Sequence, residues 1–148
     1  MAEVPRMPWA RVERRLRTAE TYWLATTRPD GRPHAMPVHG LWHERAFWFA
    51  TDRGSVKGRN LAANPAASVH LESAADVVIA EGSAAPVEDE ATTVAVTPLL
   101  AAKYGAGEGE LALGSSPDGP WLYVLRPRII HAWVEAALPE TRARWAFG

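Results

Sequence analysis

The spacing of hydrophobic positions predicts a chain made mostly of short strands with a few helices. Near the start, apolar residues recur at helical spacing while arginine and glutamate fill the positions between them, which is typical of an amphipathic helix. Its apolar residues are Trp9, Val12, Leu16 and Ala19, and Pro8 precedes it. Further along, apolar runs of strand length are separated by turn residues. About seven strands are expected, at residues 22–27, 32–42, 46–51, 67–72, 77–84, 121–125 and 128–135, with 142–147 as a candidate final edge strand.

Short turns indicate how the first three of these strands connect. Arg28-Pro29-Asp30-Gly31 and His43-Glu44-Arg45 are short enough, and have the right residues, to make two successive hairpins. In the second strand, Pro33 and Pro37 cannot donate hydrogen bonds to a neighbouring strand. That strand is therefore expected at a sheet edge, or with a bulge near residues 36–40 that leaves backbone groups free for a ligand.

Two helices are predicted between the later strands. One spans residues 56–64, and a longer one starts with the acids at 88–90 and runs to about residue 104. Pro98 is expected to kink or split the longer helix. Residues 105–119 form a long loop, which is either a plain connection or a lid. Strands joined mostly by tight turns favour a mainly β fold, an antiparallel barrel, in one domain covering residues 1–148.

The segment after the third strand has the composition of an anion-binding corner. The turn Asp52-Arg53-Gly54 leads to Ser55, which is placed to cap a helix that Asn64-Pro65 stops. The first backbone N–H groups of a helix have no intrahelical partner, and the positive end of the helix dipole lies there. Lys57 and Arg59 add full positive charges. We therefore predict a phosphate site, with an ordinary capped surface corner as the alternative.

Composition narrows the class of protein. The chain has 148 residues, 47% hydrophobic and 22% charged, which is the size and make-up of one globular domain. No apolar run approaches the ~20 residues of a membrane span, and the N-terminus lacks the hydrophobic core of a signal peptide, so a cytoplasmic protein without membrane contact is expected. A net charge of −1 argues against a nucleic-acid binder, and the lack of cysteine excludes disulfides and thiolate chemistry.

Motifs of several other chemistries are missing from the sequence. The five histidines have no H-E-x-x-H or comparable ligand spacing, so no metal site is expected. Ser115-Ser116 lies outside any G-x-S-x-G elbow, which argues against a hydrolase of that type. The chain also contains no G-x-G-x-x-G or Walker sequence, so nucleotide binding by those routes is not expected.

Several segments have an order and spacing that point to one protein family. They are Leu24-Ala25-Thr26, Arg28-Pro29-Asp30-Gly31-Arg32-Pro33-His34, Met36-Pro37-Val38, Phe47-Trp48-Phe49-Ala50-Thr51, Gly54-Ser55-Val56-Lys57-Gly58-Arg59-Asn60-Leu61 and Asn64-Pro65-Ala66-Ala67-Ser68-Val69-His70-Leu71. Together they resemble the flavin- and deazaflavin-binding split β-barrels named after pyridoxamine 5′-phosphate oxidase. The resemblance covers most of residues 8–135.

This resemblance implies a split β-barrel homodimer with two cofactor sites at the subunit interface. In such proteins the strand matching Met36-Pro37-Val38-His39 runs beside the isoalloxazine or deazaflavin ring. The strand end Ala50-Thr51 and the corner Ser55-Val56-Lys57 hold the ribityl chain and the phosphate. The resemblance also implies that Asn60 faces the site. Arg53 and Arg59 either reach the phosphate or point to solvent. Trp121 and Trp133 either form the wall that the partner subunit contributes or lie in the barrel.

The resemblance also implies the chemistry. A true pyridoxamine phosphate oxidase carries a basic C-terminal segment that grips the substrate phosphate, whereas this chain ends at residues 144–148, so vitamin B6 oxidation is not expected. The chain looks more like the small actinobacterial branch, whose members use coenzyme F420 or FMN. We expect an oxidoreductase that transfers a hydride between bound F420 or FMN and a small electron-poor organic substrate. His39 is the candidate proton donor.

A second class of function stays open at this stage. The alternative is a non-catalytic protein on the same barrel that stores or senses a flavin, or holds haem through a histidine such as His131. The sequence does not separate FMN from F420, because both present a phosphate and a tricyclic ring, and it does not name the substrate.

Overall fold

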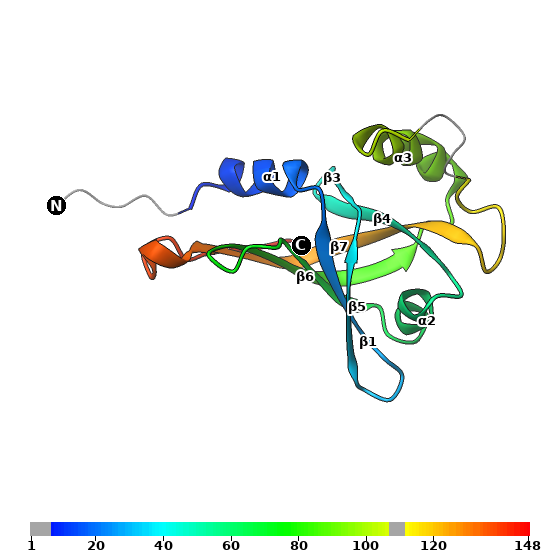
Figure 1. Cartoon of the computed structure of the whole chain (residues 1–148), viewed down its shortest axis with the longest axis horizontal. Helices are drawn as coiled ribbons and strands as arrows, with labels where there is room; N and C mark the ends of the chain where they lie inside the picture. Colours follow the sequence, from blue (N-terminus) through cyan, green and yellow to red (C-terminus); the bar gives the residue numbers. More distant parts are fainter. Residues whose placement is uncertain (1–6, 107–111) are drawn as a thin grey trace.

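The computed structural model describes residues 7–106 and 112–148, which form one curled antiparallel sheet with helices against it (Figure 1). The strands are β1 (Tyr22–Thr27), β2 (Pro33–Val38), β3 (Leu41–His43), β4 (Ala46–Asp52), β5 (Ala66–His70), β6 (Asp76–Pro86), β7 (Pro120–Val134) and β8 (Ala143–Ala146). The helices are α1 (Trp9–Thr18), α2 (Val56–Ala63), α3 (Glu90–Lys103) and a 3-10 helix, η1 (Glu135–Ala137). The sheet order is β2-β1-β5-β6-β7-β4-β3, and β8 pairs with β7. The predicted fold class, a mainly β split barrel with a few helices, is confirmed.

Two apolar clusters on the two faces of the sheet stabilise this arrangement. The larger lies inside the curl, where alternate strand residues such as Leu24, Phe47 and Phe49 are fully buried. The smaller lies under α3, where Trp48 of β4 packs with Leu100 of the helix. Because β4 is covered on both faces, its residues 46–49 are buried without alternation. The aromatic run predicted as a strand is therefore central to both clusters.

The N-terminal helix is attached to the sheet by apolar contacts and by an ion-pair cluster. Val12 and Leu16 of α1 are buried, as the hydrophobic pattern predicts. Arg11 Nη2 lies 2.6 Å from Asp76 Oδ2, and Arg15 Nη1 lies 3.0 Å from Asp76 Oδ1. These two arginines of the polar face therefore bond the start of β6, whereas Arg14 and Arg17 of the same helix are exposed. Asp76 opens β6, and no local pattern reveals that α1 crosses the start of that strand.

Neutralising Asp76 is expected to lower stability modestly. The hydrogen bond from Arg11 and the charges of Arg15 and Arg11 hold the pKa of Asp76 below its usual range. A carboxyl with a depressed folded-state pKa stabilises the fold above its unfolded-state pKa and loses that contribution as the pH falls through the folded-state pKa. Asp76→Asn should therefore lower the free energy of unfolding by about 1 kcal/mol at pH 7, measured by urea titration. The difference from wild type should shrink below about pH 4.

Glu72→Gln is the matched control, because Glu72 is exposed in the same turn region. This variant should match wild type within a few tenths of a kcal/mol. Equal stability of Asp76→Asn and wild type at pH 7 would show that the cluster contributes nothing.

The division into strands differs from the sequence prediction in two places. The predicted strand 32–42 is divided into β2 and β3, with β2 at the sheet edge as the prolines indicate. The predicted strands 121–125 and 128–135 are one strand, β7, which carries an extra residue: Gly82 of β6 is opposite Pro127 and Glu81 is opposite Ile129, so Arg128 has no partner in β6. A Cβ on Gly82 would lie 2.0 Å from the Arg126 carbonyl oxygen, so glycine permits the two strands to stay paired there.

The sequence predicts that Pro98 kinks or splits the longer helix, and the structure shows that it does not split α3. The helix runs as one element from Glu90 to Lys103 with Pro98 inside it. Proline removes the hydrogen bond to the carbonyl four residues earlier, at Val94. The Val94 residue is 66% exposed, so water can take the place of the missing donor.

Candidate functional site

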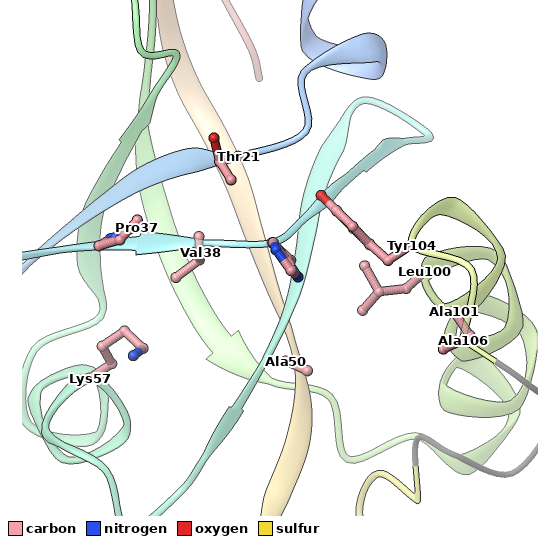
Figure 2. Close-up of a pocket in the computed structure, with 10 residues that line it drawn as sticks. Thr21, Pro37, Val38, Ala50, Lys57, Leu100, Ala101, Tyr104 and Ala106 are labelled. Carbon is pink, nitrogen blue, oxygen red and sulfur yellow. The ribbon is translucent and has the colours of Figure 1, made fainter.

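A cleft of about 610 Å³ lies where β2, the end of β4, the start of α2 and the end of α3 meet (Figure 2). Its described lining residues are Thr21, Pro37, Val38, His39, Ala50, Lys57, Leu100, Ala101, Tyr104 and Ala106. Figure 2 shows Lys57 on one side and Tyr104 with Leu100 on the other. Most of these side chains are apolar, and Lys57 brings a formal positive charge. The cleft is thus polar at one end and apolar at the other.

The β2 wall is the edge of the sheet. Within the described residues, β2 pairs with β1 alone, through positions such as Trp23 opposite Pro37 and Tyr22 opposite Val38. An edge strand leaves backbone N–H and C=O groups on its other side without a strand partner. Pro37, Val38 and His39 form this wall of the cleft. Pro37 has no backbone N–H to donate, so the backbone groups that this edge can offer a ligand are carbonyls and the N–H groups of its neighbours.

The α2 corner is built around the capping serine that the sequence predicts. Ser55 Oγ accepts a hydrogen bond from the Gly58 N–H at 3.1 Å and donates to the Asp52 carbonyl at 2.7 Å. Because a hydroxyl has one hydrogen, the 3.1 Å contact between Thr51 Oγ1 and Ser55 Oγ requires Thr51 to donate. The end of β4 and the start of α2 are thereby linked, which positions Lys57 at the cleft.

Of the eleven cofactor-binding residues predicted from the sequence, five line the cleft and six do not. Those that line it are Pro37, Val38, His39, Ala50 and Lys57. Thr51 and Ser55 bond each other at the corner behind Lys57. The side chains of Met36 and Val56 are exposed outside the lining, and so is Arg59. Asn60 is buried, and its Nδ2 donates to Thr26 Oγ1 at 3.0 Å, so in this structure it joins α2 to β1 instead of facing the cleft.

The other residues raised from the sequence also lie outside the lining. The guanidinium of Arg53 stacks over Trp121 at 4.7 Å from the ring centroid, and Arg142 lies over Trp133 at 5.9 Å. His131 is in β7, opposite Ile79 of β6 and Arg144 of β8. Of the described residues in the loop 105–119, Ala106 lines the cleft. Residues 107–111 are outside the described ranges, so whether this loop is a lid or a plain connection is not tested.

The end of α3 was missed by sequence reasoning. Leu100, Ala101 and Tyr104 form the apolar end of the cleft, and the Tyr104 ring stacks on His39 with centroids 4.2 Å apart and planes 10° from parallel. The sequence predicts a helix that ends near residue 104. No local signal places its end against residues 37–39, because that contact depends on how far the α3 segment folds back across the sheet.

Positive charge collects near the α2 corner. Burial lowers the pKa of His34 on β2, and the nearby charges of Arg28 and Lys57 lower it further. Its Nδ1 is buried and has no hydrogen-bond partner within the described residues. A protonated imidazole is disfavoured there because the surroundings are already cationic. This end of the cleft is therefore suited to an anion.

At the opposite end, Lys103 is half-buried behind Tyr104. Burial lowers the pKa of its ammonium to about 8, although the charge of Glu20 opposes the change. The folded state then binds fewer protons than the unfolded state from about pH 8 up to the usual lysine pKa of about 10.4. We expect the free energy of unfolding to gain a contribution from Lys103 as the pH rises through that window. Denaturant titrations at pH 7.5 and 9.5 should show a larger rise for wild type than for Lys103→Met.

Burial raises the pKa of Tyr22 and of Tyr104, so both phenols remain neutral across these two pH values. Their contribution to stability is lost only above about pH 10, where the unfolded tyrosines ionise first. Identical pH dependence in wild type and Lys103→Met would show that the amine has an ordinary pKa.

Two further findings concern the described residues as a whole. No described helix has the length and hydropathy needed to cross a membrane. Within residues 7–106 and 112–148, no three His, Asp or Glu side chains come together in a way that could hold a metal ion.

Sequence and fold match known proteins. A family profile described as pyridoxamine 5′-phosphate oxidase matches residues 9–133. A pyridoxine/pyridoxamine 5′-phosphate oxidase of Azorhizobium caulinodans is 38% identical over 130 residues, which are 84% of this chain and 55% of that protein. The chain thus spans little more than half the length of this relative.

Solved structures show the same fold. An F420 reductase is 26% identical, with a TM-score of 0.60, over 86% of this chain and 98% of its own. A heme-binding protein from Mycobacterium smegmatis is 24% identical, with a TM-score of 0.68, over 97% of this chain and 60% of its own. The second likeness bears on the fold alone.

Proposed function

The chain belongs to the pyridoxamine 5′-phosphate oxidase family, and from this premise we propose that it binds FMN or F420 in the cleft and transfers a hydride between that cofactor and a small electron-poor organic substrate. The family includes oxidases and, in structure, an F420 reductase. Which of the two cofactors is used, and which substrate, are questions for the experiments below.

The observation that carries the proposal is the shape of the cleft around Lys57. Both cofactors join an anionic phosphate to a flat tricyclic ring, and the cleft joins a cationic end to an apolar wall made by Pro37 and Val38. Its volume of about 610 Å³ is within the usual range of small-molecule sites. The start of α2 adds backbone N–H groups and the positive end of a helix dipole beside Lys57. The donor set therefore fits a phosphate-bearing planar ligand.

The residues of the cleft have separate tasks in this proposal. Lys57 and the α2 N–H groups bind the phosphate, and Pro37, Val38 and Ala50 orient the ring. Leu100 and Tyr104 exclude water from the apolar end. A bound flavin or deazaflavin supplies the hydride chemistry, so the protein contributes mainly orientation and electrostatics. In this proposal a ring nitrogen of His39, which lines the cleft, holds the proton that the reduced substrate requires.

The direct test is a titration of apo-protein with FMN and, separately, with F420, followed by fluorescence. We expect saturable binding of one of them at one site per chain. The bound cofactor is then reduced and mixed with quinones and enones, and reoxidation of the cofactor with formation of reduced product is expected. A protein that binds a flavin but reoxidises with none of these acceptors supports the storage alternative. Binding of neither cofactor, with a Soret band on adding haem, would replace the proposal with haem binding.

We also propose that the active form is a homodimer with the cleft at the subunit interface. The large apolar side chains of Trp23 and Met36 are about 40% exposed on the β1–β2 hairpin, which is a costly arrangement for an isolated chain. Light scattering on a sizing column should give twice the chain mass of 16.2 kDa. A mass of one chain, with cofactor bound, would show that a single subunit forms the complete site.

A further inference from the structure

The end of α3 is joined to the β2–β3 connection by hydrogen bonds to the backbone N–H and C=O of one residue, Gly40. Lys103 Nζ donates to the Gly40 carbonyl at 2.7 Å, and the Gly40 N–H donates to Tyr104 Oη at 2.8 Å. Tyr104 Oη also lies 2.9 Å from the Gly40 carbonyl and 2.7 Å from the Glu20 carbonyl, to which it donates its hydrogen. We call Lys103, Tyr104 and the backbone of Gly40 the α3 clasp.

The clasp is tied to the core through Lys103. Its Nζ donates to Tyr22 Oη at 2.8 Å, and Tyr22, which is fully buried, donates in turn to the Leu16 carbonyl. The ammonium also lies 4.8 Å from the centroid of the Tyr22 ring and 5.4 Å from that of Tyr104, so both rings face the cation. Lys103 thus connects α1, β1, the β2–β3 connection and α3.

The clasp determines the position of a cleft wall. Gly40 directly follows His39, and Tyr104 directly follows Lys103, so bonds that fix Gly40 and Lys103 also fix the two rings that stack 4.2 Å apart. Both rings line the cleft. Position 40 has room only for glycine, because a Cβ there would lie 2.1 Å from the ring of the buried Phe47. The sheet side of the clasp is therefore packed directly on the core, and Lys103 bonds the helix side to it.

We propose that Lys103 is a positioning residue that holds Tyr104 against His39 and thereby fixes the wall of the cleft opposite Lys57. This inference rests on the proposed function, because the wall matters for binding only when the cleft takes FMN or F420. An apolar residue would pack in the same half-buried place without the cost of desolvating an amine. The hydrogen bonds of its amine explain why a lysine stands there. One goes to Gly40, next to the lining residue His39, and the other goes to the buried Tyr22.

The charge state of Lys103 provides a second way to observe the clasp. The titratable groups that face the amine are Tyr22 from β1, Tyr104 from α3 and Glu20 from the connection before β1, and His39 lies on the far face of Tyr104. Because burial lowers the pKa of Lys103 to about 8, the amine loses its proton as the pH rises from 7 to 9. The closed clasp should then become more stable relative to an open one in which the amine is hydrated and keeps its ordinary pKa. An arginine at this position keeps its charge over the whole range.

The first part of the experiment uses the ligand-free protein and compares wild type, Lys103→Met and Lys103→Arg by NMR. Hydrogen-exchange protection of the Gly40 amide reports the bond to Tyr104, and the His39 ring proton shifts report the stack. Lys103→Met should reduce Gly40 protection by about tenfold relative to wild type and move the His39 resonances, whereas Lys103→Arg should retain both. Tyr104→Phe, which keeps the ring and loses the hydroxyl, is the second variant and should also expose the Gly40 amide. Unchanged Gly40 protection in Lys103→Met would overturn the proposal.

The second part measures FMN and F420 affinity of the same proteins between pH 7 and 9. Lys103→Met should bind the wild-type cofactor about tenfold more weakly at pH 7, and Lys103→Arg about as tightly as wild type. The ratio of wild-type to Lys103→Arg affinity should rise with the pH, since ligand titration is common to both proteins and only the lysine loses its charge. A loosened clasp with unchanged affinity would show a purely structural lysine and overturn the inference. Failure of the proposed function is distinct, because wild type itself would then bind neither cofactor.

Discussion

Replacing Lys57 with alanine should lower the affinity of the cleft for its cofactor by roughly 1.5–3 kcal/mol, the value of a hydrogen bond to a charged group. That range corresponds to about 10- to 150-fold in the dissociation constant. The reason is that Lys57 brings the formal charge to the described lining, in the first turn of α2. Fluorescence titration with FMN and F420 at constant ionic strength measures the change. Raising the salt concentration should weaken wild type more than Lys57→Ala.

Two variants make this result specific. Lys57→Arg keeps the charge and should recover most of the affinity. Arg14→Ala removes an exposed cation from α1, on another part of the molecule, and should bind as wild type does. If Lys57→Ala and wild type have equal affinity, the phosphate lies elsewhere, and the assignment of the cationic end of the cleft is wrong.

Replacing Gly58 with alanine should destabilise the protein, although helix propensity alone predicts the opposite. Within a helix, alanine is favoured over glycine by nearly 1 kcal/mol. In the folded chain, however, a Cβ on Gly58 would lie 2.4 Å from the Arg53 carbonyl oxygen and 2.5 Å from that of Asp52. Both are backbone atoms, so α2 would have to move away from the end of β4. We expect a loss of about 1–3 kcal/mol in the free energy of unfolding, which urea titration measures.

The same change should disturb the site. Gly58 N–H is the donor to the Ser55 cap, and Lys57 precedes it, so displacement of α2 moves the lysine from the cleft. Ala62→Gly is the matched control in the exposed part of the same helix. It should cost about 1 kcal/mol through propensity and leave cofactor affinity unchanged. A Gly58→Ala protein as stable as wild type would mean that the helix and the turn do not approach each other this closely.

Local patterns located most of the elements. The helical spacing of apolar residues places α1, and the turn, cap and stop signals around residues 52–65 place α2 within one residue at its end. These signals work because capping, turn conformation and amphipathic spacing are satisfied by neighbours in the chain. The strand at 120–134 was divided in the prediction because Pro127 is a strong local breaker. Gly82, which permits the close approach to β7 at this point, belongs to another strand, so the pairing cannot be predicted from the residues around Pro127.

The candidate site was predictable to the same extent. The α2 corner carries its own cap and cations, and the prolines of β2 mark an edge strand, so Lys57 and residues 37–39 were found. Asn60 was expected to face the site, yet it bonds Thr26, 34 residues earlier in the chain. The positions of Leu100 and Tyr104 were not predicted, because a helix ending at residue 104 can meet many parts of the sheet.

The sequence by itself therefore determined most of the strands and helices, the capped corner at the start of α2 and the family. It did so because hydrogen bonding within a turn or helix, and the alternation of apolar residues, involve only near neighbours. Only the tertiary structure decided that α1 meets Asp76, that Gly58 must be glycine, and that Lys103 and Tyr104 bond the backbone of Gly40. Each of these depends on contacts between segments far apart in the chain, whose geometry follows from packing the whole sheet and its helices together.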